Sequence, residues 1–460
     1  MNQYDVIIIG AGPAGIFAAR ELVEKSSLRI LMVEKGKVLE KRKCLADHKN
    51  DVSGCLNCKL CSIMCGWGGA GAYSDGKLTL TTEFGGWLTN YIGKKELEEY
   101  IAYVDDIYVR HGAPDHLFGK PQEQIDDLKN HLAKANLKLV PARIRHMGSE
   151  NTLVVLKKFK EALQGSITIK TEEKVEEILV SEQRVCGIKT PKDQYFASKV
   201  ICAPGRDGAQ WFSDQARKLG IKLNNNQVDV GVRVEIPSVT MKELTDLVYE
   251  PKIFFYTRCF DDVVRTFCVN PNGIVVMENT NGVITVNGHA FANSKTANTN
   301  FALLLSQEFT EPFDQPILYG RSIASLANML SGGIIVQRYG DLKRGRRSTY
   351  SRLEKGIVEP TLKTAVPGDL SLVLPHRYMV GIQETLEALD LAIPGIASDH
   401  TLLYGIEAKF YSARPKLSNS LETSIKGLWA IGDGAGVTRG LIQSSVSGVI
   451  AARDILARAL

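Results

Sequence analysis

Short apolar runs alternate with helical segments at both ends of the chain. Residues 6–9 form a continuous apolar run, residues 16–25 have helical composition, and residues 30–33 form a second apolar run. Runs of this length without alternating polar positions are typical of strands buried on both faces of a parallel sheet. Similar runs at 199–203 and 428–433, and a small-residue helix from 441 onward, predict that distant parts of the chain build one parallel sheet.

The middle of the chain has a different pattern. Helices are expected at 97–109, 121–135 and 152–163, and short strands at 167–169, 174–179 and 187–189. Strand-like segments follow at 228–236, 264–269, 273–277 and 283–286. Arg233 and Glu235 alternate with valines on the first of these, which favours a salt-bridged sheet face. The region predicts a second domain built on a mixed sheet.

The loop after the first apolar run has the composition of a phosphate-binding turn. Gly10, Gly12 and Gly15 form a G-x-G-x-x-G motif between the expected strand and helix. Gly10 permits the turn, Gly12 lets the backbone approach a pyrophosphate, and Gly15 allows close helix–strand packing. Glu34 lies 19 residues after Gly15, where an acidic side chain accepts hydrogen bonds from an adenosine ribose. The motif predicts a Rossmann-like dinucleotide site.

Composition excludes several classes of protein. The chain has 460 residues, 44% of them hydrophobic and 23% charged, and a formal net charge of +5. This balance is typical of a globular protein of two or three domains and excludes disordered and coiled-coil proteins. No apolar run is long enough to span a membrane and no export signal is visible, so we expect a cytoplasmic protein. The one dense basic run, at 343–347, has no interleaved aromatic residues, so nucleic-acid binding is not expected.

The C-terminal segment distinguishes FAD from NAD. Gly432-Asp433 ends the run at 428–433, and Gly440 precedes the last helix. This pattern resembles the second FAD motif of the glutathione-reductase-like flavoproteins, and residues 203–206 resemble a conserved turn of that superfamily. The resemblance implies that Asp433 binds the ribityl or pyrophosphate part of FAD and that the last helix faces the flavin pyrimidine. No second G-x-G-x-x-G is present in mid-chain, so NAD(P)H, a candidate reductant, would bind without its own Rossmann unit.

Five of the nine cysteines lie within residues 44–65. Cys55, Cys58, Cys61 and Cys65 have the C-x2-C-x2-C-x3-C spacing of bacterial ferredoxins. In two-cluster ferredoxins the fourth cysteine of such a run ligates another cluster, and this chain has only one run. We therefore predict one [4Fe–4S] cluster, with Cys44 as its fourth ligand and Cys65 as the alternative. A zinc site or free redox-active thiols are the competing interpretations.

A glycine-rich segment follows the cysteine run. Its glycines would let backbone amides close on an anion or a flat ring, although a flexible linker is the alternative. Motifs here and later resemble a microbial family of largely uncharacterised FAD-dependent dehydrogenases, over nearly the whole chain. They are Gly68-Gly69-Ala70-Gly71, Ser74-Asp75-Gly76-Lys77, Gly340-Asp341-Leu342, Gly345-Arg346-Arg347-Ser348-Thr349, Pro367-Gly368-Asp369-Leu370, Leu403-Tyr404-Gly405-Ile406-Glu407, Lys409-Phe410-Tyr411-Ser412 and residues 432–440. The resemblance implies FAD and the fold but no particular substrate.

These motifs define an expected fold, domain organisation and cofactor site. The expected fold class is α/β, with a discontinuous Rossmann-like FAD-binding domain and a second, mixed-sheet α+β domain. The FAD-binding domain is expected at 1–95, 165–212 and 401–460, with a helical insertion at 96–164 and a substrate or cap domain at 213–400. The residues expected to bind FAD, with Val175 implied only by the resemblance, are Gly10, Gly12, Pro13, Ala14, Gly15, Glu34, Lys35, Arg42, Gly69, Ala70, Val175, Ala203, Gly205, Gly432, Asp433, Gly440, Leu441 and Ile442.

The combined motifs predict an FAD-dependent oxidoreductase. Flavin can accept two electrons as a hydride and release them singly, whereas an iron–sulfur cluster carries one electron at a time. The leading hypothesis is therefore exchange between FAD and a one-electron carrier such as a ferredoxin, or NAD(P)H, with a small-molecule substrate that the sequence does not identify. The alternatives are a flavoprotein with a zinc or thiol site that acts by hydride transfer alone, and an electron-transfer subunit of a larger complex.

Overall fold

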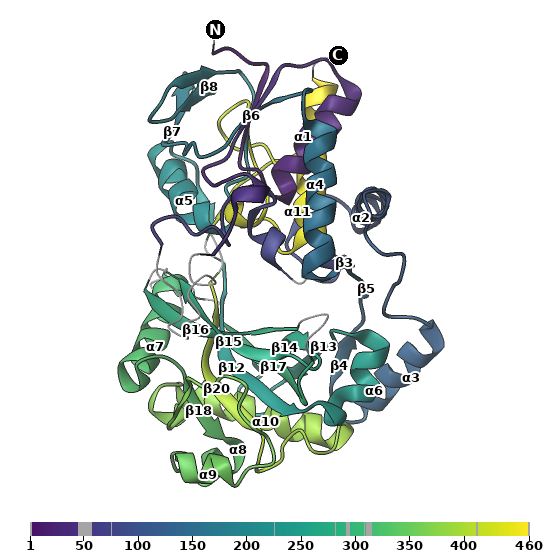
Figure 1. Cartoon of the computed structure of the whole chain (residues 1–460), viewed down its shortest axis with the longest axis vertical. Coiled ribbons are helices and arrows are strands. Elements are labelled where there is room, and N and C mark those ends of the chain that lie inside the picture. Colours follow the sequence, from purple (N-terminus) through teal and green to yellow (C-terminus); the bar gives the residue numbers. More distant parts are fainter. Residues whose placement is uncertain are drawn as a thin grey trace. The chain divides into compact units, whose positions relative to one another are not determined.

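The structure is a computed structural model that describes residues 2–44, 58–74, 76–224, 226–280, 282–290, 295–307, 309, 315–410 and 413–458. The chain forms two compact units. Unit 1 comprises Met1–His116, Arg145–Asn226 and Ser412–Leu460, and unit 2 comprises Leu117–Ile144 and Gln227–Tyr411. Both units are therefore built from segments that are far apart in the sequence (Figure 1).

Unit 1 contains a five-stranded parallel sheet with the strand order β22-β10-β1-β2-β6. The strands are β22 (Leu428–Ala430), β10 (Val200–Cys202), β1 (Val6–Ile9), β2 (Ile30–Val33) and β6 (Thr168–Lys170). β1 and β2 are fully buried along their length, as their unbroken apolar runs predict. The predicted parallel sheet from distant parts of the chain is confirmed.

Helices cover this sheet through close backbone contacts and aromatic packing. α1 (Pro13–Lys25) packs along α11 (Leu441–Ala457) (Figure 1). A side chain at Gly448 would lie 2.1 Å from the Ala14 carbonyl oxygen, so the two helix backbones are in direct contact. Phe17 of α1 meets Tyr108 of α2 (Lys94–Arg110) and Phe159 of α4 (Gly148–Leu163), with ring centroids 5.1 and 5.3 Å away.

The remaining strands and helices of unit 1 form smaller elements. They are β3 (Lys77–Leu80), β7 (Glu177–Ser181), β8 (Arg184–Lys189), β9 (Gln194–Phe196), α5 (Ala209–Lys218), β11 (Leu223–Asn224) and β21 (Arg414–Pro415), while β5 (Arg143–His146) spans the unit boundary. β7, β8 and β9 form an antiparallel meander, and the Gln215 side chain of α5 hydrogen-bonds to Glu176 and Ile178 at its edge.

Unit 2 is built on an eight-stranded mixed sheet with the order β19-β18-β20-β12-β17-β14-β13-β4. Its strands are β4 (Lys138–Val140), β12 (Val228–Pro237), β13 (Lys252–Tyr256), β14 (Val263–Asn270), β17 (Asn298–Gln307), β18 (Ile335–Arg338), β19 (Val366–Pro367) and β20 (Leu402–Lys409). A separate hairpin, β15 (Ile274–Thr280) and β16 (Val283–His289), packs against β20. The helices are α3 (Gln122–Ala133), α6 (Ser238–Val248), α7 (Pro316–Ser331), α8 (Tyr339–Lys343), α9 (Tyr350–Glu354) and α10 (His376–Ala392).

The two faces of this sheet differ in chemistry. Alternate residues of β12, from Val228 to Ile236, join one apolar core with side chains of α3, α6, α7 and α10. The residues between them include Asp229, Arg233 and Glu235, which are buried as well. The sheet therefore has an apolar face under the helices and a buried charged face on the other side.

The fold class predicted from the sequence is confirmed, with differences in its details. The expected insertion at 96–164 is not a unit of its own, because α2 and α4 pack into unit 1 while 117–144 belongs to unit 2. Unit 2 also begins at Gln227, not at 213, since α5 packs on the meander of unit 1. The strand expected from 174 begins at Glu177, which leaves Val175 in the preceding loop.

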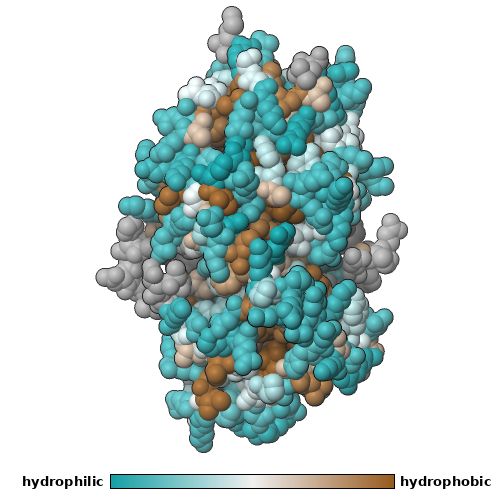
Figure 2. All heavy atoms as spheres, turned by 90° about the vertical axis from the view of Figure 1, so that its right-hand side faces the viewer, coloured by the Kyte–Doolittle hydropathy of each residue, from teal (hydrophilic) through white to brown (hydrophobic). Residues whose placement is uncertain are grey.

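None of the helices in the described part of the chain combines the length and apolar character needed to cross a bilayer. Figure 2 shows one face of the molecule, on which polar side chains predominate and apolar ones form small separate patches.

Candidate functional site

Four loops of unit 1 meet at one edge of the parallel sheet. They follow β1, β2, β10 and β22 and carry Gly10, Glu34, Ala203 and Gly432. Main-chain hydrogen bonds connect neighbouring strands at this edge: the Gly10 N–H donates to Val33 and the Ala203 N–H donates to Ile9, each over 2.8 Å. The carboxyl edge of a parallel sheet is the usual place for ligands in such folds. The sequence-predicted loops are thus brought together, although they are hundreds of residues apart.

The structure explains why position 15 of the first loop must be glycine, but it does not explain the glycine at position 12. A Cβ at Gly15 would lie 2.0 Å from the Gly10 carbonyl oxygen, so close packing within the protein requires glycine there. Gly12 has an extended backbone, with φ −80° and ψ −178°, that any residue can adopt. A Cβ at Gly12 would meet only the Gly69 Cα, at an ordinary 3.9 Å. The protein's own packing therefore does not explain the glycine at position 12, which lies at the start of α1 with only an ordinary contact to the Gly69 backbone among the described residues.

The glycine-rich segment packs against this loop. The Gly68 N–H donates to the Ala11 carbonyl over 2.7 Å, and Gly69 begins a short 3-10 turn, Gly69–Tyr73. A Cβ at Gly71 would lie 2.6 Å from the Leu441 side chain at the start of α11. These contacts bring the predicted residues Gly69, Ala70 and Leu441 to the same edge of the sheet as Gly12.

Glu34 organises the loops through its buried carboxylate. One oxygen accepts a hydrogen bond from the Ala11 N–H at 2.9 Å. The other accepts from the Gly36 and Gly66 N–H groups at 2.8 and 3.0 Å. An ionised carboxylate has about four acceptor positions, so three of those of Glu34 are used by the protein. One acceptor position of Glu34 therefore has no donor among the described residues.

Lys35 and Asp207 form an ion pair beside the turn at Gly205. Burial opposes the charged form of Lys35, but the hydrogen bond to Asp207 and the nearby acidic groups together outweigh it, so the pKa of Lys35 is raised. The Cys65 thiol donates to the Asp207 carboxylate over 3.2 Å, and burial raises the pKa of this thiol to about 12. Lys35, which was predicted to bind the cofactor, thus has a partner within the protein.

The side chain of Arg42 also forms its hydrogen bonds within the protein. Its guanidinium donates to the carbonyls of Ser62, Ile63 and Trp67, over 2.9, 2.7 and 2.6 Å, and only 2% of the residue is exposed. The loss of hydration lowers the pKa of this guanidinium. The structure therefore places Arg42 as the residue that holds the loop between the cysteine run and the glycine-rich segment.

Asp433 and the start of α11 form the opposite side of the site. Asp433 accepts from the Thr438 hydroxyl over 3.0 Å and lies 3.3 Å from the Arg206 guanidinium. Gly440, with φ 88°, precedes α11 and has open space around it, whereas the side chain of Ile442 is buried. Three other residues expected to bind FAD lie elsewhere in unit 1. Pro13 and Ala14 begin α1, and Val175 is buried in the loop before β7.

Sequence analysis missed one residue in the first turn of α11. The Gln443 side chain donates to the Phe84 carbonyl over 3.0 Å, but its own carbonyl oxygen is buried and accepts no hydrogen bond within the described residues. A buried acceptor without a donor is unfavourable by roughly 1–3 kcal/mol, which suggests a site for a ligand N–H or O–H group. A glutamine among apolar residues at the helix start was the available signal in the sequence.

The predicted metal ligands are not brought together in the part of the structure that is described. Cys58 is exposed, Cys44 and Cys61 are half-buried, and Cys65 is buried against Asp207. No three His, Cys, Asp or Glu side chains among the described residues are arranged to hold a metal ion. Cys55 lies outside the described residues.

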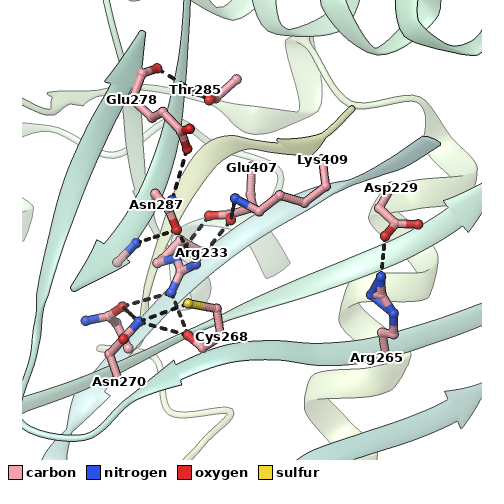
Figure 3. Close-up of polar contacts among 12 residues, drawn as sticks. Asp229, Arg233, Arg265, Cys268, Asn270, Glu278, Thr285, Asn287, Glu407 and Lys409 are labelled. Atoms are coloured by element: carbon pink, nitrogen blue, oxygen red, sulfur yellow. Dashed lines mark hydrogen bonds and ion pairs between the residues drawn. The ribbon is translucent and has the colours of Figure 1, made fainter. Parts of the chain in front are cut away.

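In unit 2, the charged face of the sheet is occupied by protein partners. Arg233 donates to both carboxylate oxygens of Glu407, over 2.9 and 3.1 Å, and to Asn300 over 3.0 Å. Lys409 lies 2.8 Å from Glu407, and Arg265 pairs with Asp229 (Figure 3). The favoured salt-bridged face for Arg233 is thus observed, with a partner 174 residues away.

The dense basic run is also partly neutralised within unit 2. Lys343 and Arg344 pair with Asp399 over 3.0 and 2.7 Å. Arg346 pairs with the buried Asp341 over 2.8 Å. Three side chains of the run therefore form ion pairs within unit 2.

Comparison with known proteins supports a flavoprotein. Residues 228–410 match a family described as "FAD-dependent protein, C-terminal domain-like". The chain is 26% identical to an uncharacterized protein of Clostridium beijerinckii, over 98% of this chain and 80% of that protein. Among solved structures it is similar to glycine oxidase from Geobacillus kaustophilus (14% identity, 100% and 95% of the two chains, TM-score 0.40). L-proline dehydrogenase from P. horikoshii is also similar (11% identity, 99% and 93% of the two chains, TM-score 0.42). The family match supports the prediction of an FAD-dependent oxidoreductase.

Proposed function

We propose that this protein is an oxidoreductase that binds FAD at the carboxyl edge of the unit 1 sheet. The observation that carries the proposal is Gly12, since neither its backbone conformation nor its protein neighbours require glycine. A pyrophosphate next to the backbone at this position supplies the missing reason. The family match of residues 228–410 supports the same cofactor from the other unit.

The residues at this edge fit the parts of FAD. Gly12 and the first turn of α1 would bind the pyrophosphate through backbone N–H groups and the helix dipole. Glu34 has one acceptor position for the adenosine ribose, and Asp433 would accept from the ribityl chain. The carbonyl oxygen of Gln443 would accept from the flavin imide N–H. FAD would supply hydride-accepting chemistry, while these side chains bind and orient it.

The proposal is tested by cofactor analysis of the purified chain. We expect about one FAD per chain after release by acid, or after reconstitution with added FAD. Anaerobic titration with dithionite should then bleach the flavin bands, and a panel of amino and hydroxy acids should identify the reductant. A chain that neither retains FAD nor takes it up on reconstitution contradicts the proposal.

The iron–sulfur cluster is a finer proposal that rests on cysteine spacing alone. Cys55, Cys58 and Cys61 would be ligands with Cys44, because Cys65 donates to Asp207. We expect Cys44→Ala to lose the cluster or to retain only three irons, and Cys65→Ala to keep four. Iron and sulfide analysis, together with electron paramagnetic resonance, decides whether Cys44 or Cys65 is the fourth ligand. Zinc in both variants would favour the flavoprotein with a zinc site, and turnover only with an added complex would favour the electron-transfer subunit.

The electron donor and acceptor are proposals of the same kind. NAD(P)H or a ferredoxin-like carrier would exchange electrons with the flavin, in addition to a small-molecule substrate. Rapid mixing of the protein with NADH, NADPH and a reduced ferredoxin, each under anaerobic conditions, distinguishes them by the rate of flavin bleaching. No bleaching by any of the three would leave the small-molecule substrate as the reductant.

A further inference from the structure

A loop of unit 1 that contains Trp87 packs against the segment leading into α11. The Trp87 N–H donates to the Val437 carbonyl over 2.9 Å, and the Arg439 N–H donates to the Gly85 carbonyl over 2.6 Å. Arg439 immediately precedes Gly440, the residue before α11. Trp87 therefore lies beside the end of the candidate site at which the flavin ring is expected.

Two arginines stack on this tryptophan. The guanidinium carbon of Arg439 lies 4.2 Å from the centroid of the Trp87 ring, and that of Arg414 lies 5.1 Å from it. Cation–π contact offsets part of the cost of removing such groups from water.

Arg414 has no other use in the described part of the protein. Its main chain pairs with Asn224 in the short β11–β21 sheet. Its Nη1 atom is buried and makes no hydrogen bond there, and its guanidinium forms none of the ion pairs found among the described residues. Tyr91 is nearby: burial raises the pKa of its hydroxyl, and the charge of Arg414 opposes that rise.

Arg458 is another arginine of unit 1 that stacks on a tryptophan, and its partners differ from those of Arg414. The guanidinium carbon of Arg458 lies 5.2 Å from the centroid of the Trp429 ring, close to the distance for Arg414. Arg458 also donates to both oxygens of Glu422, over 3.0 and 2.8 Å, and lies 2.7 Å from Asp454. Its charge is thus balanced by carboxylates, whereas no carboxylate pairs with Arg414 among the described residues. Stacking on tryptophan therefore does not by itself account for the charge of Arg414.

We propose that Arg414 binds a carboxylate group of the substrate, with the ring of Trp87 supporting its guanidinium. The inference rests on the proposed function, since it assigns the substrate class of the same site. A planar guanidinium forms two parallel hydrogen bonds to a carboxylate, and a half-buried position strengthens them. The structure thus points to an organic acid, such as an amino or hydroxy acid, as the molecule that reduces the flavin.

The test measures binding of acetate and benzoate by isothermal titration calorimetry, with benzamide as the uncharged match of benzoate. We expect both carboxylates to bind the purified protein and benzamide not to bind. Arg414→Met keeps much of the packing on Trp87 and should weaken benzoate binding by about ten- to a hundredfold, from the usual strength of a charge-assisted hydrogen bond. Arg414→Lys keeps the charge without the fork and should weaken binding less.

The matched control is Arg458→Met, which removes a stacked arginine whose charge is already balanced. It should leave benzoate binding unchanged. Equal binding by Arg414→Met and the unaltered protein overturns the proposal, as does equal weakening in Arg458→Met. Should Arg414→Met fail to fold by circular dichroism, the same decision falls on Arg414→Lys, where unchanged benzoate binding overturns the proposal.

Two further measurements separate this inference from the proposed function. FAD content is determined on every sample, so full FAD content without carboxylate binding overturns only the subsite. Carboxylate binding that depends on Arg414 in a chain that never takes up FAD overturns the flavoprotein and keeps the carboxylate site. Inorganic phosphate is titrated in parallel, and binding of phosphate more tightly than benzoate through Arg414 overturns the assignment to a carboxylate.

Discussion

The charged face of the unit 2 sheet and the carboxyl edge of the unit 1 sheet both collect polar groups, but they use them differently. On the unit 2 face, Arg233 and Glu407 are completely buried and satisfy each other through two hydrogen bonds. At the unit 1 edge, Gly12 makes only an ordinary contact with the Gly69 backbone, and Gln443 keeps a buried acceptor without a donor in the described residues. The difference separates groups that hold the fold from groups that are available to a ligand.

The free-energy cost of burying a charged group explains why the two regions differ. A buried charge must be paired, because loss of hydration costs several kcal/mol per ion. The unit 2 sheet satisfies this requirement with neighbouring strands, since β12 and β20 are adjacent and Glu407, which lies opposite Gly231, is within hydrogen-bonding distance of the Arg233 side chain. The loops of unit 1 instead point away from the sheet, where no neighbouring strand can supply partners. Unpartnered groups at such an edge are stable only if a bound molecule or solvent satisfies them.

The largest expected effect comes from the two glycines of the first loop. Gly15→Val should prevent folding or cost at least about 4 kcal/mol, because its side chain would overlap the Gly10 carbonyl. Gly12→Val should fold with nearly unchanged stability and lose FAD. Urea unfolding and FAD analysis of both variants measure the two effects. A folded Gly12→Val protein with one FAD per chain would refute the proposed position of the pyrophosphate.

The next effect concerns the buried pair of unit 2. Glu407→Ala leaves the Arg233 charge buried with its ion-pair partner removed and should destabilise the protein by about 3–5 kcal/mol. The double variant Arg233→Met/Glu407→Leu removes both charges of the pair and should recover part of this loss, because Lys409 still lacks its Glu407 partner. Chemical denaturation of the three proteins gives the values. Equal stability of the single and double variants would mean that the pair does not hold the sheet as described.

The same pair predicts how stability depends on pH. Burial opposes the charged form of Glu407, but Arg233 and Lys409 outweigh it and lower the pKa of its carboxyl in the folded state. The carboxyl therefore contributes stability that is complete above the unfolded-state pKa of about 4.3 and is lost as pH falls through the lower folded-state value. Thermal unfolding between pH 3 and 7 should show this loss, and the double variant should show less of it.

The smallest effect is expected at Asp433. Asp433→Ala removes one hydrogen-bonding carboxylate but leaves the loop of Gly12 and the first turn of α1 in place. FAD binding should weaken by about 1.5–3 kcal/mol, or roughly ten- to a hundredfold, whereas Gly12→Val should abolish it. Titration of the FAD-free protein with FAD, followed by quenching of flavin fluorescence, gives both constants. A stronger effect at Asp433 than at Gly12 would reverse their proposed roles.

Much of the candidate site could be predicted from local sequence patterns. The apolar runs and the G-x-G-x-x-G spacing identified β1, the following turn and α1, because strand burial and turn geometry depend on neighbouring residues. Local sequence patterns were less informative about Lys35 and Arg42, which were expected to bind FAD. Each lies near the predicted cofactor loop in sequence, yet the structure gives each a partner inside the protein, Asp207 and a set of main-chain carbonyls.

The amino-acid sequence by itself determined the elements of the parallel sheet, the loops at its carboxyl edge and the class of cofactor that those loops suit. Only the tertiary structure decided which polar groups have partners. Arg233 and Glu407 meet because β12 and β20 pair, and Arg414 reaches Trp87 across more than 300 residues of chain. Such contacts depend on how distant segments fold together. The free energy of each charge is set by these neighbours in space, and no local pattern records them.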